Sequence, residues 1–258
     1  MRYGYNFGDE FAPWLINKIN GITYDTPCSL NSDSILFSVG SILWACNDRS
    51  TIWGSGIIDL KQPLRKLPKK VCTVRGLFSR QKLLTHDVQC PEIYGDPAVL
   101  APMYFNPKVE QKYELGIIPH IVEYQDIKKK YSNIDNIKII NLQTRNIESV
   151  IKDILSCKTT LCSALHGLII SVMYDIPTRW IKLSNKLYGD GIKYYDFFSS
   201  LDHKVFENFN LNTFNTKQEK YNPLIIKDKD LRHLINQTYL YSKENINISK
   251  IIESCPLL

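Results

Sequence analysis

The sequence lacks any apolar run long enough to cross a bilayer. No stretch approaches the ~20 apolar residues that a membrane-spanning helix needs. The beginning of the chain, MRYGYNFGDEF, also lacks the basic-then-apolar pattern of a secretory signal. These two absences predict a cytoplasmic protein.

Paired cysteines and clustered histidines are missing as well. The seven cysteines include no CxxC pair, and most lie in or beside apolar segments. We therefore predict reduced, buried thiols rather than disulfides. The five histidines show none of the short, fixed spacings to cysteine that a zinc site needs. We expect no structural metal and no cofactor.

The net charge of +6 comes without a basic stretch that alternates with aromatic residues, which disfavours nucleic acid as a partner. A small anionic substrate needs only a few well-placed cations. Hydrophobic residues at 44% and charged residues at 22% are close to globular averages. A chain of 258 residues fits one large α/β domain or two domains of about 100 to 130 residues.

The first half of the chain alternates short apolar runs with glycine-containing loops. ILFSVGS from Ile35, TIWGSGII from Thr51 and VCTVRG from Val71 predict buried parallel strands. FSRQKLLTH then predicts a helix, and EIYGDPAVL from Glu92 predicts a further strand stopped by glycine and proline. This order of strand, loop, helix and strand is typical of a doubly wound α/β fold.

The same rhythm begins again at Leu115. LGIIPH and IKIINL predict strands, QDIKKKYS and NIESVIKDILSC predict helices, and residues 159–183 predict strand, sharp loop, helix and strand. The proline-flanked segment 102–112 is the natural linker. We predict an α/β fold with two Rossmann-like halves facing across a cleft. The domains would be residues 1–107, residues 108–210 and a helical tail, 211–258, packed on the body.

Polar residues follow several predicted strands, at the edge where a doubly wound sheet binds its ligands. His120 ends LGIIPH, and His166 lies in SALHGLI, where the next glycine permits close backbone approach and a helix begins. A lone histidine on an apolar strand is more often a core residue, which is the competing interpretation of both. His166 is the best single candidate for chemistry.

Two arginines and two aspartates are further candidates near predicted loops, and the list is completed by Lys193 and Asp196 in KLYGDGIKYYDFF. Arg75 and Arg80 flank a strand-to-helix loop, which suits a carboxylate or phosphate, although surface salt bridges are the alternative. Asp9 in NFGDE either caps a helix or orients a substrate hydroxyl. Asp96 lies in a Gly-Asp-Pro turn, for which we predict a structural role.

Eight collinear motifs carry a family resemblance. NFGDE, FSVGS, IWGSGI, VRG, YGDPAVLAP, LGIIPH, SALHGLI and KYYDFF resemble, in order and spacing, the motifs of the polysaccharide pyruvyl transferases over roughly 6–200. The nearest likeness is to the exopolysaccharide ketal pyruvate transferases. The resemblance implies a glycosyltransferase-B-like fold and phosphoenolpyruvate as the donor substrate. Pyruvate would pass as a cyclic ketal to a hexose of a surface polysaccharide or of its precursor, releasing phosphate.

The resemblance also implies roles for individual residues. Arg75 and His166 fall on donor-contact positions, whereas some relatives carry arginine where this chain has Ala164, so another cation must substitute. Protonating the donor's methylene carbon needs a general acid, and fixed cations stabilise the departing phosphate, so no divalent metal is required. We predict catalytic roles for His166, Asp9 and His120. We predict substrate-binding roles for Arg75, Arg80, Leu165, Asn6, Lys193 and Ser163.

Two alternatives remain open on the sequence. A glycosyltransferase that uses a nucleotide sugar would share the architecture and the phosphate-binding cations. The second half of the chain shows no convincing glutamate-rich nucleotide loop, which disfavours this alternative. A binding or scaffolding member of the family without turnover is the second alternative. The acceptor is either free or linked to lipid, and a lipid-linked acceptor would bring the protein to the inner face of the plasma membrane.

Overall fold

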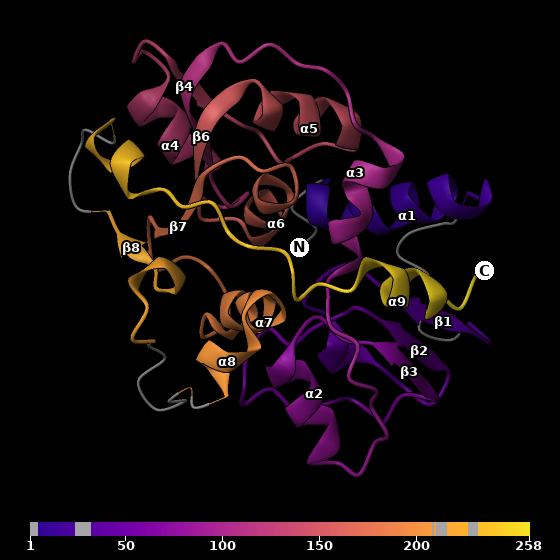
Figure 1. Ribbon diagram of the computed structural model, residues 1–258. Helices are drawn as coiled ribbons and strands as arrows, with labels where there is room; N and C mark the ends of the chain where they lie inside the picture. The colour runs from indigo at the N-terminus through magenta and orange to yellow at the C-terminus, as the bar shows by residue number, and fades with distance from the viewer. Residues whose placement is uncertain (1–4, 24–31, 208, 210–215, 227–231) are drawn as a thin grey trace. The chain divides into compact units, whose positions relative to one another are not determined.

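The structure is a computed structural model, and it describes residues 5–23, 32–207, 209, 216–226 and 232–258 (Figure 1). The chain divides into two compact units, each assembled from segments that are distant in sequence. Unit 1 comprises Met1–Glu10, Ala101–Leu187 and Lys217–Tyr241, and unit 2 comprises Phe11–Leu100, Tyr188–Thr216 and Ser242–Leu258. These ranges differ from the predicted domains because the chain leaves and re-enters each unit, which local periodicity does not encode.

Unit 1 is built on a five-stranded sheet whose neighbouring strands are all parallel, in the order β5-β4-β6-β7-β8. Helices cover both faces of a parallel sheet of this kind, so most positions near the carboxyl ends of its longer strands are buried. The predicted strands and helices of the second half are confirmed, although the β5 strand is shorter than IKIINL. The strands are β4 (Tyr113–Ile118), β5 (Ile137–Ile139), β6 (Cys157–Cys162), β7 (Thr178–Lys182) and β8 (Leu224–Ile225). The helices are α3 (Ala101–Tyr104), α4 (Tyr124–Tyr131), α5 (Ile147–Leu155) and α6 (Leu165–Met173), with the short 3-10 helices η3 (Glu219–Tyr221) and η4 (Arg232–Gln237).

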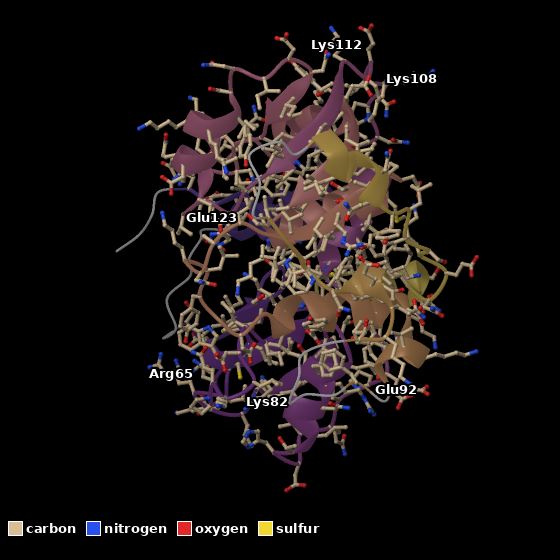
Figure 2. The ribbon with its side chains drawn as sticks, turned by 90° about the vertical axis from the view of Figure 1, so that its left-hand side faces the viewer. Arg65, Lys82, Glu92, Lys108, Lys112 and Glu123 are labelled. Atoms are coloured by element: carbon tan, nitrogen blue, oxygen red, sulfur yellow. The ribbon has the colours of Figure 1, made fainter. Side chains whose placement is uncertain are left out.

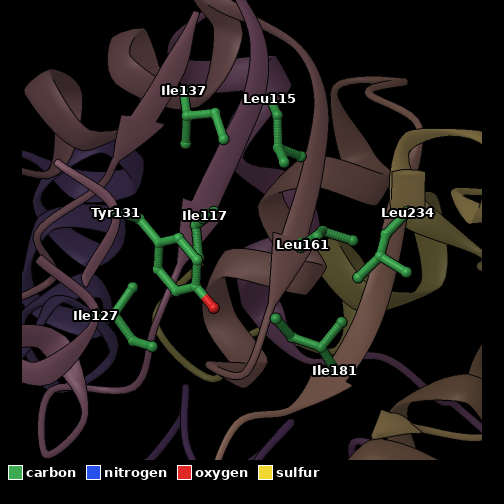
Figure 3. Close-up of a cluster of buried hydrophobic side chains, with 8 residues drawn as sticks. All are labelled: Leu115, Ile117, Ile127, Tyr131, Ile137, Leu161, Ile181 and Leu234. Atoms are coloured by element: carbon green, nitrogen blue, oxygen red, sulfur yellow. The ribbon is translucent and has the colours of Figure 1, made fainter. Parts of the chain in front are cut away.

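One face of the unit 1 sheet carries a cluster of buried hydrophobic side chains (Figure 3). Helix α4 contributes Ile127 and Tyr131, and η4 contributes Leu234. Each fully buried side chain of this size stabilises the fold by roughly 1.5–3 kcal/mol. The strand residues of the cluster come from four adjacent strands and are Ile137, Leu115, Ile117, Leu161 and Ile181.

Helix α6 lies unusually close to strand β4. A Cβ atom on Gly167 would meet Ile118 Cγ2 at 2.5 Å, a separation that atoms do not tolerate, so only glycine permits this approach. The resulting contact fixes the start of α6 beside the end of β4. The glycine of SALHGLI therefore has the packing role that the sequence predicted for it.

Unit 2 contains a smaller parallel sheet in the order β1-β2-β3. Its strands, and the helix predicted from FSRQKLLTH, occur as expected. The strands are β1 (Ile35–Phe37), β2 (Ser50–Trp53) and β3 (Lys70–Thr73). The helices are α2 (Leu77–Leu84), α7 (Ile192–Leu201), α8 (His203–Phe206) and α9 (Ile248–Glu253), with the 3-10 helices η1 (Leu43–Ala45) and η2 (Pro97–Leu100). Helix α1 (Phe7–Asn20) begins within unit 1 and continues in unit 2.

The prediction of a strand for EIYGDPAVL is wrong, because this segment forms only one isolated β-bridge. Only Tyr94 pairs, as an isolated parallel bridge to Val74, and the chain then turns into η2. Gly95 adopts φ +147°, which a strand does not accommodate. The fully buried Asp96 accepts a hydrogen bond from the Ala98 amide at 3.1 Å, which is the structural role predicted for this turn.

The C-terminal segment is less helical than predicted. Its described part forms the 3-10 helices η3 and η4, the short strand β8, which pairs with β7, and helix α9. Helix α9 packs on unit 2, where Trp53 Nε1 donates to the Ile251 carbonyl at 2.9 Å and Thr73 Oγ1 lies 2.6 Å from Ser254 Oγ. The segment thus divides between the two units instead of forming one tail.

The cysteines that the structure describes are buried free thiols, as predicted. They are Cys46, Cys72, Cys90, Cys157, Cys162 and Cys255, and Cys28 lies outside the described residues. Burial raises the pKa of the Cys162 thiol to about 11. Within the described segments, no helix has both the length and the apolar character needed to cross a membrane.

Candidate active site

The carboxyl ends of three neighbouring strands of unit 1 meet at one edge of its sheet. Ile118 at the end of β4 pairs with Cys162 at the end of β6, and Cys162 pairs with Trp180 of β7. The loops that follow these strands therefore emerge side by side, as they do where parallel sheets bind ligands. They carry His120, Ser163 and Ser184.

Glu123 joins these three loops. Its side chain is 2% exposed, and Figure 2 labels it. Ser163 Oγ donates to Glu123 Oε2 at 2.5 Å, and Ser184 Oγ donates to Oε1. A buried carboxylate is costly unless hydrogen bonds satisfy it, and these two hydroxyls do so.

His120 is held by the same loops. Its backbone N–H donates to Ser163 Oγ at 3.0 Å, and its carbonyl accepts from the Glu123 N–H at 2.8 Å. The Val122 N–H donates to the His120 Nδ1 atom at 3.4 Å. Because Nδ1 accepts this bond, the proton of a neutral ring lies on Nε2. The imidazole is partly exposed.

His166 occupies the second position of helix α6, and Gly8 lies against its ring. A Cβ atom on Gly8 would be 2.2 Å from His166 Nδ1 and 2.6 Å from Cε1. Only glycine at this position leaves room for the imidazole. The Phe7 N–H donates to the Leu142 carbonyl at 2.8 Å, which ties the beginning of α1 to the loop after β5. The N-terminal motif NFGDE therefore shapes the surroundings of His166.

The remaining predicted residues of unit 1 have different settings. Leu165 is buried as the first residue of α6. The partly exposed Asn6 precedes α1, and its Oδ1 accepts from the Gly8 N–H at 3.4 Å. Asp9 is exposed in the first turn. Asn6, rather than Asp9, supplies the side chain that caps the helix, which removes the capping alternative for Asp9.

An exposed ion pair also ties the loop after β7 to helix α4. Lys186 Nζ lies 2.5 Å from Asp126 Oδ2 on the surface of the unit. The hydrogen bond from Lys186 lowers the pKa of Asp126, and the same bond raises the pKa of Lys186. This exposed pair contributes little stability, because solvent screens it. It nevertheless lies directly beside the buried Ser184–Glu123 bond.

In unit 2, Arg75 is fully buried in a network with Asp196. Arg75 Nε and Nη2 each lie 3.0 Å from Asp196 Oδ2. Arg75 Nη1 donates to Ser41 Oγ at 2.6 Å, and Nη2 donates to the Ile57 carbonyl at 2.5 Å. Ser79 adds bonds from its N–H and Oγ to Asp196 at 2.9 and 2.5 Å. Phosphoenolpyruvate could contact the Arg75 guanidinium only if these hydrogen bonds rearranged. The role of Arg75 in binding this donor substrate therefore stays a prediction.

Arg80 and Lys193 also lie in unit 2. Arg80 Nε donates to the Cys90 carbonyl at 3.1 Å, and Nη2 lies 3.1 Å from Glu92 Oε1. The ion-pair alternative given for Arg80 is therefore present. Lys193 is 8% exposed, with Nζ 5.2 Å from the centroid of the Tyr194 ring. The substrate-binding roles of Arg80 and Lys193 stay predictions.

Comparison with known proteins decides the family. The sequence profile of polysaccharide pyruvyl transferase matches residues 3–185. The chain belongs to the polysaccharide pyruvyl transferase family. An uncharacterized protein of Acanthamoeba polyphaga mimivirus is 30% identical over 203 residues, which cover 75% of this chain and 70% of that protein. No solved structure matches the chain significantly.

As a polysaccharide pyruvyl transferase, the chain is an enzyme that transfers a pyruvyl group onto polysaccharide. The family match covers the whole Glu123 arrangement, with His120 and His166, and also Arg75. It ends before Lys193, whose substrate-binding role stays a prediction.

Sequence reasoning missed Glu123 and Ser184. Glu123 follows His120 by three residues, and an acidic residue just before a helix is normally exposed or caps that helix. Nothing in local periodicity shows that its side chain turns inward to serines 40 and 61 residues away. The available signal was weak: a polar residue after each of three neighbouring strands, with one carboxylate among them.

Proposed function

We propose that this pyruvyl transferase uses phosphoenolpyruvate as donor and forms a cyclic ketal on a hexose of a surface polysaccharide or its precursor. The family match supports pyruvyl transfer onto polysaccharide in general. The observation that carries the proposal further is the pair of histidine-bearing loops at the carboxyl edge of the unit 1 sheet. An edge of this kind, beside the start of a helix, suits an anionic donor.

The proposed chemistry balances without an added reactant. A general acid protonates the methylene carbon of phosphoenolpyruvate, and the oxygen of one sugar hydroxyl bonds to C2 as that hydroxyl loses its proton. The C2–O bond to phosphate then breaks, and the leaving phosphate takes the electron pair. A second hydroxyl of the same sugar attacks C2 and loses its proton, which closes the ring. Two hydroxyl protons are released while one proton is added to carbon and one is taken up with phosphate.

His166 is the residue that we assign to the acid or to the phosphate contact. It is partly exposed, and it lies in the first turn of α6, where unpaired backbone N–H groups favour an anion. His120, or Asp9, would orient the acceptor. Asn6, Ser163 and Leu165 would complete the substrate surroundings.

The other parts of the proposal concern unit 2 and the wider setting. Arg75, Arg80 and Lys193 would supply cations for the donor, which requires the guanidinium of Arg75 to exchange some of its present partners for donor oxygens. The proposal also includes a glycosyltransferase-B-like arrangement of the two units. It further includes a lipid-linked acceptor and activity at the inner face of the plasma membrane.

The test is phosphate release from phosphoenolpyruvate by the purified protein with a panel of hexosides, both free and lipid-linked. We expect acceptor-dependent release that His166→Ala reduces on the order of 10²-fold or more, as for loss of a general acid. His86→Ala is the matched control, because His86 is exposed in unit 2 and lies outside the candidate site. Consumption of a nucleotide sugar with no use of phosphoenolpyruvate would overturn the proposal.

A further inference from the structure

Glu123 is a buried carboxylate that does not take the local role open to it. It stands immediately before helix α4, where an acidic side chain ordinarily accepts from the free N–H groups of the first turn. Its side chain makes no such capping bond. The carboxylate is thus buried without a local hydrogen bond. Because burial of a carboxylate is costly, residues more distant in the sequence must supply its hydrogen bonds.

Those partners fix the direction of a chain of hydrogen bonds. Ser163 and Ser184 each donate the hydroxyl proton to a carboxylate oxygen of Glu123. Their lone pairs are then free to accept. Ser163 Oγ accepts from the His120 N–H at 3.0 Å, and Ser184 Oγ accepts from the Lys186 N–H at 3.1 Å.

The same bonds reach the loops of both candidate histidines. His120 is held at its N–H through Ser163 and at its carbonyl by the Glu123 N–H. Ser163 also donates its backbone N–H to the Ile118 carbonyl at 3.1 Å and lies two residues before the start of α6, which carries His166. One carboxylate therefore anchors both the loop that carries His120 and the segment that leads into the helix of His166.

We propose that Glu123 is a positioning residue, which sets the places of the His120 and His166 rings through Ser163 without touching substrate. The expected effect of Glu123 on turnover rests on the proposed function. The expected effect of Glu123 on the surroundings of the two histidines follows from the hydrogen bonds alone and does not rest on it.

The experiment compares Glu123→Gln and Glu123→Ala with the matched control Asp126→Asn. Asp126 is an exposed carboxylate on helix α4, which follows Glu123, and its partner Lys186 is on the same loop as Ser184. Glutamine keeps the shape of glutamate, but its amide nitrogen must face one hydroxyl and reverse that bond. Alanine removes every side-chain bond.

Two readouts separate positioning from general stability. In NMR spectra of the histidine rings, both Glu123 variants should shift the His120 and His166 signals and their titration midpoints, while Asp126→Asn should leave them in place. In turnover, Glu123→Ala should lower kcat on the order of 10²-fold, the scale expected for a misplacement of about 1 Å. Glu123→Gln should recover part of this loss, with a smaller effect on the KM for phosphoenolpyruvate.

The proposal is overturned if a folded Glu123→Ala protein keeps both histidine signals and their midpoints, or if Asp126→Asn shifts them equally. If Glu123→Ala fails to fold, the same NMR comparison with Glu123→Gln and Ser184→Ala tests the proposal. If the wild-type protein shows no turnover of phosphoenolpyruvate, the proposed function fails, while the NMR comparison still decides the role of Glu123.

Discussion

Substituting Gly8 by alanine tests whether the N-terminal motif shapes the setting of His166. The added Cβ atom would be 2.2 Å from His166 Nδ1, whereas ordinary contact begins near 3.4 Å. The ring must therefore withdraw by about 1 Å, which on its own can reduce turnover on the order of 10²-fold.

The free energy of unfolding should change modestly. Glycine to alanine within a helix stabilises by up to about 1 kcal/mol, and overpacking costs about 1–3 kcal/mol, so the net loss stays within about 3 kcal/mol. Denaturant unfolding and steady-state kinetics measure the two quantities. Lys18→Ala, on the exposed last turn of the same helix, is the control and should change neither.

The double variant Gly8→Ala with His166→Ala sharpens the test. Removing the imidazole removes the clash, so the stability lost in Gly8→Ala should return while turnover stays low. If Gly8→Ala keeps full turnover, or if the double variant is as unstable as the single one, the reasoning about Gly8 and His166 is refuted.

Three further predictions follow from buried groups. Asp196→Ala should lower the free energy of unfolding by about 3–5 kcal/mol in urea titrations, because it leaves the Arg75 charge buried without a partner; a loss below 1 kcal/mol would contradict this. Gly167→Ala should cost about 1–3 kcal/mol by the same measurement, since its Cβ would meet Ile118 at 2.5 Å. Burial raises the pKa of Cys162 to about 11, above its ordinary value of 9.0, so the unfolded state releases this proton first and stability should fall as the pH rises from 9 to 11. Burial raises the pKa of Cys46, Cys90 and Cys157 to about 11 as well, so Cys162→Ala should make that fall shallower without abolishing it.

Elements with a clear apolar period could be predicted from the sequence. NIESVIKDILSC became α5, where Asn146 accepts from the Ser149 N–H at 3.0 Å as a capping residue should. Parallel strands were recognisable because burial on both faces leaves continuous apolar runs. EIYGDPAVL misled for the same reason: its apolar residues are buried, but positive φ at Gly95 turns the chain into a 3-10 helix.

The candidate site was predictable only in part. His120 and His166 stand out because each follows an apolar strand, and that placement was correct. The inward turn of Glu123 depends on serines far along the chain, and the burial of Arg75 depends on Asp196, 121 residues away. Pairings of this kind arise from tertiary structure, so local sequence patterns do not reveal them.

The most direct test of the central claim is transfer from phosphoenolpyruvate to a hexoside in D₂O, followed by mass spectrometry of the product. The account predicts that the hexoside gains one pyruvylidene group carrying a single deuterium on its methyl carbon, with one phosphate released for each group transferred. A product without that deuterium would contradict protonation of the methylene carbon. A hexoside that gains a sugar from a nucleotide donor, and no pyruvylidene group, would contradict the proposed donor.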